Sequence, residues 1–324
     1  MRVGILQFGP QLGSFDDNIK RAESILATAD CQSLDLLVLP ELAFSGYNFP
    51  DLPSIKPFLE PTAAGPTTRW ALNTARRLNC HIIVGYPEIH TNLSSGETTH
   101  YNSTVTVSPT GEVLNNYRKS FLYYTDEIWA TEGFLSSQAR TPFSITSIGG
   151  IGPVGHGICM DINPYRFEAP WTDYEFANSM LRAGVKTIVL SMAWLTRLAP
   201  ADLEIEPEKP DMETVAYWLE RFFPLRDAES NPRVEDDVIV VFANRCGIEG
   251  NRIGSVRVEN GGEVEDGDRV CYAGSSCVMR FQGGGVRMFE KKDREVAVLG
   301  KGEEALLVVD TGRPARYLLQ PRET

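Results

Sequence analysis

The sequence has no long apolar run and no excess of positive charge. Its apolar stretches are shorter than the roughly 20 residues that a membrane-spanning helix needs. Its 31 Lys and Arg residues are outnumbered by 43 Asp and Glu residues, which gives a formal net charge of −12. A chain with this charge is a poor partner for nucleic acid or anionic lipid. We therefore expect neither nucleic acid nor a membrane among its partners.

Cysteine and histidine are scarce, and neither occurs with metal-binding spacing. There are six Cys and four His in 324 residues, and no two cysteines form a C-x-x-C pair. The opening residues, MRVGILQFGP, contain too short an apolar segment for a secretory signal, and no cleavage site follows. We expect reduced thiols, no metal, no cofactor and a cytoplasmic location, with a nuclear pool left open.

Short apolar runs alternate with amphipathic segments along the whole chain. Residues 2–8, 34–40 and 81–87 are typical of buried strands, whereas apolar residues within 19–29 and 66–78 recur at helical spacing. The second half of the chain shows the same alternation of apolar runs and amphipathic segments, and it also contains hairpins. Strands that alternate with helices predict an α/β sandwich with mixed sheets.

No low-complexity linker divides the sequence, so we expect residues 1–324 to form a single domain. The acidic, proline-bearing segment 199–211 is the clearest loop insertion. We interpret it as a solvated connection, and a lid over a site is the alternative.

One cysteine lies at the boundary between an apolar segment and a polar segment. The apolar run 151–158 leads to Cys159, and the acids Asp161 and Glu168 follow, together with Arg166. A buried strand that ends on a thiol and continues into polar turn residues is one way in which α/β folds present a nucleophile. The alternative is that Cys159 is a small, inert core residue.

Two charged residues occupy similar positions beside apolar segments. Glu41 directly follows the apolar run LDLLVLP, and Lys119 precedes the aromatic run FLYY. Each has an ordinary interpretation: Glu41 as a solvated sheet edge, and Lys119 as a surface lysine with a packed stem. Either residue alone is a weak signal.

The order Glu41, Lys119, Cys159 in the segments LLVLPELAFSGY, NNYRKSFLYYTDE and GHGICMD resembles the nitrilase, or carbon–nitrogen hydrolase, superfamily. The opening segment QFGPQLG and the later segment ANRCGIE extend the resemblance over nearly the whole chain. It implies an α-β-β-α sandwich of two mixed sheets, and pairing of chains into a homodimer.

A longer segment than usual follows the cysteine. In CMDINPYRFEAPW the arginine is displaced to Arg166, and the next strand ends in SMAWL. This pattern resembles the eukaryotic protein N-terminal amidases, which deamidate N-terminal Asn and Gln. The resemblance implies that the partners of this chain are N-termini of proteins or peptides that bear Asn or Gln.

The resemblance also implies catalytic roles. Cys159 is the nucleophile, Glu41 the general base, and Lys119 stabilises the oxyanion together with the backbone N–H of Met160. Glu127 corresponds to a second glutamate that orients the site. Its alternative is a surface acid beside Asp126.

The candidate substrate contacts include acids that lie near the nucleophile in the sequence. Asp161 is placed to bind the α-ammonium of a terminal residue, although an acid two residues after the cysteine can also be structural; Glu168 and Glu127 are the next candidates. Trp194 and Met192 resemble residues that wall the pocket, and otherwise are ordinary core.

Three functions remain open from the sequence. The leading hypothesis is hydrolysis of the side-chain amide of N-terminal Asn, and of Gln. The alternatives are a small-molecule amidase of the same superfamily, acting on glutamine-like amides or ureido acids, and a catalytically silent module that binds N-termini. A Cys–His protease is excluded, because residues three apart in a strand point to opposite faces, which separates His156 from Cys159.

Overall fold

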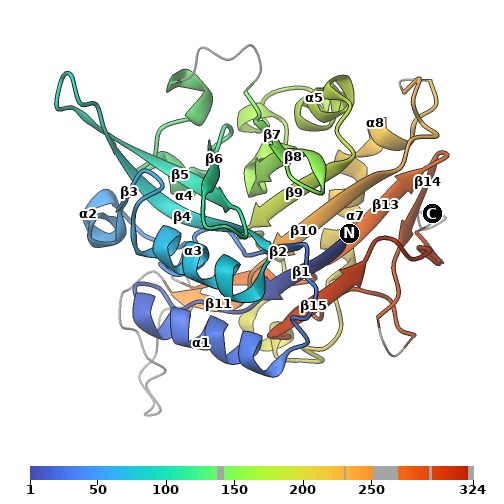
Figure 1. Ribbon diagram of the computed structural model, residues 1–324, viewed down its shortest axis with the longest axis horizontal. Helices are drawn as coiled ribbons and strands as arrows, with labels where there is room; N and C mark the ends of the chain where they lie inside the picture. The colour runs from blue at the N-terminus through green and yellow to red at the C-terminus, as the bar shows by residue number, and fades with distance from the viewer. Residues whose placement is uncertain (137–141, 230, 251–268, 292–293, 320–324) are drawn as a thin grey trace.

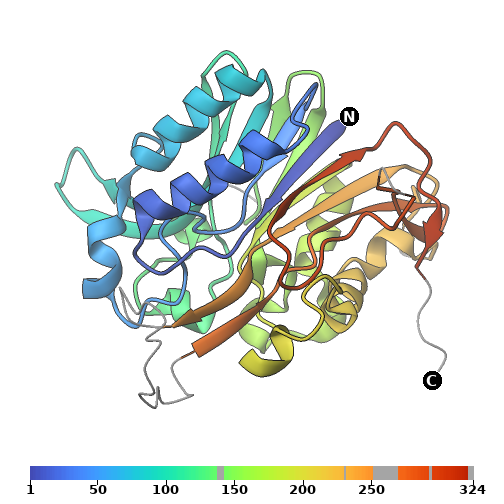
Figure 2. The ribbon, with the colours of Figure 1, turned by 90° about the horizontal axis from the view of Figure 1, so that it is seen from below.

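Two mixed β-sheets pack face to face, and helices cover their outer faces (Figure 1, Figure 2). The computed structural model describes residues 1–136, 142–229, 231–250, 269–291 and 294–319. Within these residues, no helix combines the length and the apolar character required to cross a bilayer.

The first sheet contains the N-terminal strands and one strand from the end of the chain. In spatial order its strands are β15 (Ala305–Asp310), β1 (Arg2–Gln7), β2 (Leu36–Val38), β4 (His81–Thr91), β5 (Thr98–Val107) and β6 (Val113–Arg118), with β3 (Glu60–Pro61) also paired to β4. β1, β2 and β4 are parallel, whereas β15, β5 and β6 join antiparallel. β2 is shorter than the strand predicted over 34–40.

The second sheet is built in the same way around a parallel centre. In spatial order its strands are β16 (Tyr317–Leu318), β14 (Gly285–Met288), β13 (Cys277–Gln282), β10 (Val238–Asn244), β9 (Thr187–Met192), β8 (Gly152–Ile158) and β7 (Ile145–Ile148). β10, β9 and β8 are parallel to one another.

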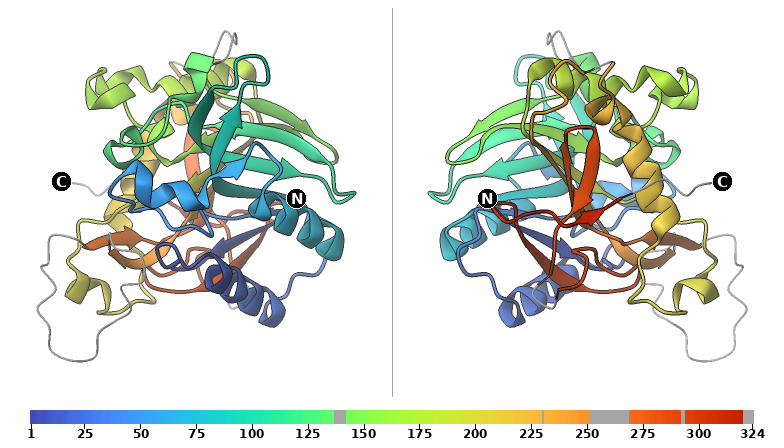
Figure 3. Two further views of the ribbon diagram at one scale, coloured as in Figure 1. Left: turned by 90° about the vertical axis from the view of Figure 1, so that its left-hand side faces the viewer. Right: turned by 90° about the vertical axis from the view of Figure 1, so that its right-hand side faces the viewer.

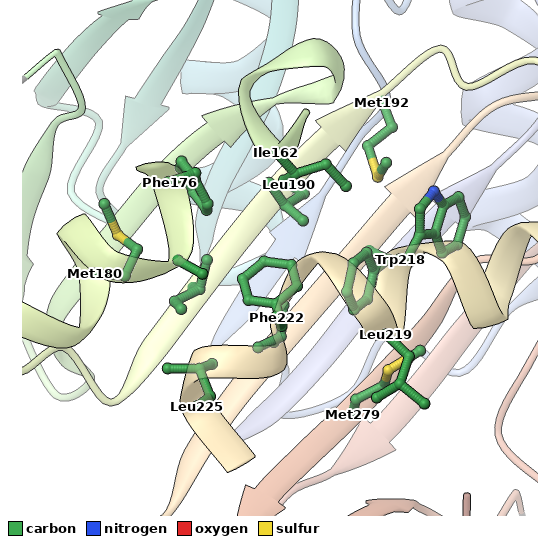
Figure 4. Packing of buried hydrophobic residues seen from close by; sticks show 14 of the residues in the cluster. Ile162, Phe176, Met180, Leu190, Met192, Trp218, Leu219, Phe222, Leu225 and Met279 are labelled. Carbon is green, nitrogen blue, oxygen red and sulfur yellow. The ribbon is translucent and has the colours of Figure 1, made fainter. Parts of the chain in front are cut away.

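Two longer helices cover the first sheet and three helices cover the second. α1 (Phe15–Thr28) and α3 (Pro66–Leu78) pack on the first sheet. α5 (Glu175–Ala183), α7 (Met212–Arg221) and α8 (Phe223–Arg226) pack on the second. Figure 4 shows Trp218, Leu219 and Phe222 lying over the strands, with Phe176 and Met180 beside them. Short helical turns complete the chain: α2 (Leu52–Ile55), η1 (Lys56–Phe58), α4 (Tyr124–Glu127), η2 (Gly133–Ser136), η3 (Cys159–Ile162), η4 (Tyr165–Phe167), η5 (Trp171–Asp173) and α6 (Pro200–Leu203).

The strands bury both faces, with alternate residues pointing to different layers. In β10, Val241 lies in the cluster between the two sheets, whereas its neighbours Val240 and Phe242 pack against the helices. Val3 and Ile5 of β1 meet this inter-sheet cluster from the other side. The predicted α-β-β-α sandwich of two mixed sheets is confirmed.

A separate two-stranded ribbon lies beside the segment predicted as a loop insertion. β11 (Cys246–Gly250) pairs with β12 (Arg269–Ala273), and α6 packs against β12 (Figure 3). The segment 199–211 therefore contains a helical turn. Its Leu203 is buried, while most of its other residues are exposed.

Candidate active site

The nucleophile candidate sits at a sharp turn directly after a strand. β8 ends at Ile158, and Cys159 begins η3 with a φ of +40°, an unusual value for a residue with a side chain. Such backbone strain is often found at functional sites, where the surrounding structure holds it in place. The thiol-bearing residue is 7% exposed and lines a cavity.

Glu41 and Lys119 lie together beside this turn and have no exposure to solvent. Lys119 Nζ is 2.6 Å from Glu41 Oε1, and the backbone N–H of Ala193 donates to Glu41 Oε2 at 2.8 Å. The structure thus brings together Glu41, Lys119 and Cys159 from distant parts of the chain. The electrostatic coupling of Cys159 to both Glu41 and Lys119 reflects this proximity.

A glycine on the neighbouring strand lets the chain turn at Glu41. A Cβ on Gly85 would stand 2.6 Å from the backbone N of Leu42, 2.7 Å from Glu41 Cα and 2.7 Å from Pro40 O. Because all three obstructing atoms belong to the backbone, this close approach requires glycine. Gly85 in β4 is thus a structural requirement of the turn.

Asp126, and not Glu127, is the second acid at this site. Asp126 Oδ2 lies 2.6 Å from Lys119 Nζ and is fully buried, whereas Glu127 is exposed. Consecutive residues of a helix point about 100° apart, so α4 turns one acid into the site and the other to solvent. The sequence-based assignment of Glu127 is therefore wrong by one position.

Two further polar residues that the sequence analysis missed complete the network. The side-chain amide of Asn102 donates to Glu41 Oε1 at 2.7 Å and to Asp126 Oδ1 at 2.9 Å. Tyr47 donates its hydroxyl to Asp126 Oδ2 at 3.2 Å, and its ring lies 5.6 Å from Lys119 Nζ. Asn102 lies among other polar residues of β5, so no sequence signal marked it, and Tyr47 had none either.

Burial governs the ionisation of the site. Burial raises the pKa of Glu41, an effect that the charge of Lys119 only partly offsets. Burial lowers the pKa of Lys119, but the carboxylates of Asp126 and Glu41 outweigh it, so the net shift is upward. Burial and the negative charge of Glu41 raise the pKa of the Cys159 thiol well above its ordinary value. A neutral thiol, a base of raised pKa and a fixed cation therefore share one buried site.

Asp161 is not placed to bind a substrate amine, because it is fully buried and does not line the cavity beside Cys159. It accepts the backbone N–H groups of Ser120, Phe121 and Ile158 at 2.7–3.0 Å and the hydroxyl of Tyr117 at 2.7 Å. It is completely buried, and burial raises its pKa to about 6. Its role is to hold the turn after β8 against the segment that follows Lys119, so the substrate-contact assignment is wrong.

A cavity of about 970 Å³ opens beside Cys159. Aromatic side chains on its wall are Tyr47, Tyr123, Phe167, Trp194 and Tyr217. The prediction of Trp194 as a wall residue agrees with this arrangement, and Met160, the proposed oxyanion donor, also lines the cavity.

Two other predicted contacts lie elsewhere. Met192 is fully buried and packs in the core of the second sheet (Figure 4), so its ordinary interpretation as a core residue is correct. Glu168 is exposed and does not line the cavity. The loop insertion, in contrast, contributes Pro210 and Asp211 to the wall.

His156 lies in β8 and does not line the cavity either. Burial lowers its pKa to about 4, so its imidazole is neutral near pH 7. In the described part of the chain, no group of three or more His, Cys, Asp or Glu residues is arranged to hold a metal ion.

Comparisons with known proteins agree with this arrangement. Residues 2–164 match the model of the carbon-nitrogen hydrolase family. The chain is 36% identical over 300 residues to the protein N-terminal amidase of Schizosaccharomyces pombe, a match that covers 88% of this chain and 92% of that protein. It is 33% identical over 273 residues to the protein N-terminal amidase of Saccharomyces cerevisiae, covering 73% of this chain and 58% of that protein.

A solved structure shares the fold. The crystal structure of an N-terminal amidase with an Asn-Glu peptide superimposes with a TM-score of 0.73 at 22% identity, over 95% of this chain and 96% of that one. The buried cysteine, glutamate and lysine, the two-sheet sandwich and the sequence matches lead to one conclusion: the chain belongs to the carbon–nitrogen hydrolase family.

Proposed function

We propose that this chain hydrolyses the side-chain amide of an N-terminal Asn, and of Gln, in proteins or peptides, releasing ammonia. The observation that carries the proposal is the buried group of Cys159, Glu41 and Lys119 on a cavity large enough for a terminal residue and its neighbour. The 36% identity to a protein named as an N-terminal amidase supports the substrate class. We propose that the chain acts as a single catalytic domain.

The first half of the reaction forms a thioester. Glu41 takes the thiol proton of Cys159, and the sulfur attacks the amide carbon. Negative charge develops on the amide oxygen, where the ammonium of Lys119 and the N–H of Met160 stabilise it. Removal of one such donor costs about 3 kcal/mol of transition-state stabilisation. Glu41 then gives its proton to the departing nitrogen, and the C–N bond breaks to release ammonia.

In the second half of the reaction, Glu41 acts again as the base. Glu41 takes a proton from water, whose oxygen attacks the thioester carbon, and the C–S bond breaks. The sulfur recovers a proton, and the product carries a side-chain carboxyl group in place of the amide. Asp126 contacts Lys119 and not the reacting atoms, so we assign it a positioning role.

A protein N-terminus is distinguished from an internal Asn by its α-ammonium, which needs an acidic partner in a desolvated site. Acids on the cavity wall are Asp211, Glu213 and Glu220. Glu220 is paired with Arg226 at 2.8 Å, whereas Asp211 and Glu213 have no ion-pair partner among the described residues. We propose Asp211 as the contact, because four hydrogen bonds hold its carboxylate rigidly.

The Asp211 contact is tested by Asp211→Asn. Asn caps a helix N-terminus as well as Asp does, so α7 should keep its start and the protein its stability. We expect the KM for Asn-initiated peptides to rise about tenfold or more, while the neutral variant Glu213→Gln changes it little. An unchanged KM in Asp211→Asn, with a raised KM in Glu213→Gln, would assign the contact to Glu213.

The function is tested by measuring ammonia released from three sets of substrates. Peptides that begin with free Asn or Gln should react, whereas their acetylated forms and peptides with Asn at the second position should not. Turnover of the acetylated peptides, or of free amino-acid amides alone, would replace the proposal with a general or small-molecule amidase. Cys159→Ser should abolish turnover, and an acyl-thioester on Cys159 seen by mass spectrometry would exclude a silent binding module.

Homodimer formation stays a prediction of the resemblance, and a cytoplasmic location stays a prediction of the sequence. Light scattering on the purified chain and imaging of a tagged chain in cells would test them.

A further inference from the structure

A buried asparagine outside the catalytic group holds one wall of the site. Asn244 is the last residue of β10 and is fully buried. Its side-chain Oδ1 accepts the backbone N–H of Trp194 at 2.7 Å, and its Nδ2 donates to the carbonyl oxygens of Gly274 at 3.0 Å and Trp194 at 3.3 Å. One amide side chain thus binds both backbone groups of Trp194.

The position of Asn244 explains why a side chain is needed there. The parallel pairing of β9 and β10 ends at Met192 and Asn244, where the N–H of Arg245 donates to Met192 O. Beyond this point the chain leaves β10 and enters β11, and the N–H of Trp194 has the side chain of Asn244 as its partner, while the Trp194 carbonyl also accepts the N–H of Ala273 at 2.9 Å. The amide of Asn244 has the donor and acceptor of a peptide group, and it extends the ladder by one residue.

Ala193, the residue before Trp194, contacts the active site through its backbone. The N–H of Ala193 donates to Glu41 Oε2 at 2.8 Å, while the other carboxylate oxygen, Oε1, is bound by Lys119 and Asn102. The N–H of Ala193 therefore helps to fix the carboxylate of the base.

We propose that Asn244 is a positioning residue that fixes the N–H of Ala193 onto Glu41. The inference rests on the proposed function only for the roles of Glu41 and Cys159. Asn244 carries no charge and acts through backbone geometry. Ionisable groups that face Glu41 and Cys159 from the surrounding elements are Tyr47, Lys119, Tyr123, Asp126 and Tyr272.

The test measures how fast iodoacetamide alkylates Cys159 at pH 8, followed by digestion and mass spectrometry of that cysteine. In Asn244→Ala the N–H of Ala193 should leave Glu41. Glu41, the base that takes the thiol proton, would then no longer be held in place beside Cys159, and alkylation should slow about tenfold. A merely structural role would loosen the site, expose the thiol and leave the rate unchanged or faster, which would overturn the proposal.

The matched control is Asn231→Ala. Asn231 is also buried, and it binds the backbone of Leu225 and Arg233 at 3.1 and 2.8 Å, away from the cavity wall. Its replacement should lower stability without slowing alkylation of Cys159. Equal slowing in both variants would count against the proposal.

A milder variant covers the case in which Asn244→Ala does not fold. Ser276→Ala removes the hydroxyl that bonds to the backbone N and O of Asn244, each at 3.0 Å. It should slow alkylation in the same direction by a smaller factor, and an unchanged rate would refute the proposal. Alkylation requires no substrate, so this result is independent of whether N-terminal amides are hydrolysed, which the ammonia assay decides.

Discussion

Asp126 and Glu127 are adjacent acids of similar chemistry, but only Asp126 is buried against Lys119. Its carboxylate also accepts the amide of Asn102 and the hydroxyl of Tyr47. These bonds hold the lysine ammonium at a fixed place between two carboxylates. The position of the cation in the site therefore depends on a residue that does not touch the cavity.

Exchange of the two acids for their amides gives a direct comparison. Asp126→Asn removes one of the two negative charges that hold Lys119, so the ammonium should move relative to the thiol. We expect kcat/KM to fall about a hundredfold, the size of effect that a displacement of about 1 Å produces. Glu127→Gln should keep nearly full activity and stability, because Glu127 is exposed. Ammonia release and thermal unfolding of both variants check this, and a larger loss in Glu127→Gln would reverse the assignment.

At the scale of elements, each proposed catalytic residue lies just after a strand. Cys159 follows β8, Lys119 follows β6, and Glu41 lies in the turn after β2. The side-chain hydroxyl of Ser191 in β9 donates to Leu39 O at 2.9 Å, which ties the second sheet to that turn. The packing of the two sheets therefore sets the distance between base and nucleophile.

Gly85 offers a test of this dependence on the strands. The Cβ of Gly85→Ala would press on the backbone of the Glu41 turn, at a cost of about 1–3 kcal/mol of stability. Movement of Glu41 by about 1 Å should reduce kcat/KM about a hundredfold. Gly149→Ala is the control, because a Cβ there has no atom within 4 Å. Equal kinetics in the two variants, with Gly85→Ala stably folded, would show that the turn tolerates displacement.

The elements themselves were largely predictable, because buried strands and amphipathic helices leave a clear periodic pattern. The proposed catalytic residues Cys159, Glu41 and Lys119 were identified from the residues beside them and from the family resemblance of their order. Asp126 was missed because the orientation of a four-residue helix cannot be read from periodicity. Asp161 was misassigned because three of its four partners come from residues 117–121, which only the fold brings beside it.

At the scale of the whole molecule, the two sheets bury a histidine between them. His156 of β8 is 1% exposed, and its ring centroid lies 6.5 Å from that of Tyr117 in β6, a strand of the other sheet. Neither ring nitrogen has a hydrogen-bond partner among the described residues. A protonated imidazole there would be a buried charge without compensation, so folding keeps His156 neutral.

This histidine should make the fold sensitive to acid. Burial lowers the pKa of His156 from 6.5 to about 4, so between these values the unfolded chain binds a proton that the folded protein does not. Its contribution to stability is therefore intact above pH 6.5 and is lost as the pH falls towards 4. A difference of about 2.5 pKa units corresponds to about 3 kcal/mol.

The comparison of wild type with His156→Leu isolates this effect, because the other buried groups, such as Asp161, titrate in both proteins. We expect the free energy of unfolding, measured with urea at pH 7 and pH 4.5, to fall less with acid in the variant, by roughly 2–3 kcal/mol. At pH 7 the variant should be close to wild type in stability, since leucine replaces a neutral ring without hydrogen bonds. If both proteins lose the same free energy between these pH values, His156 is protonated in the folded state, and the two sheets must accommodate its charge.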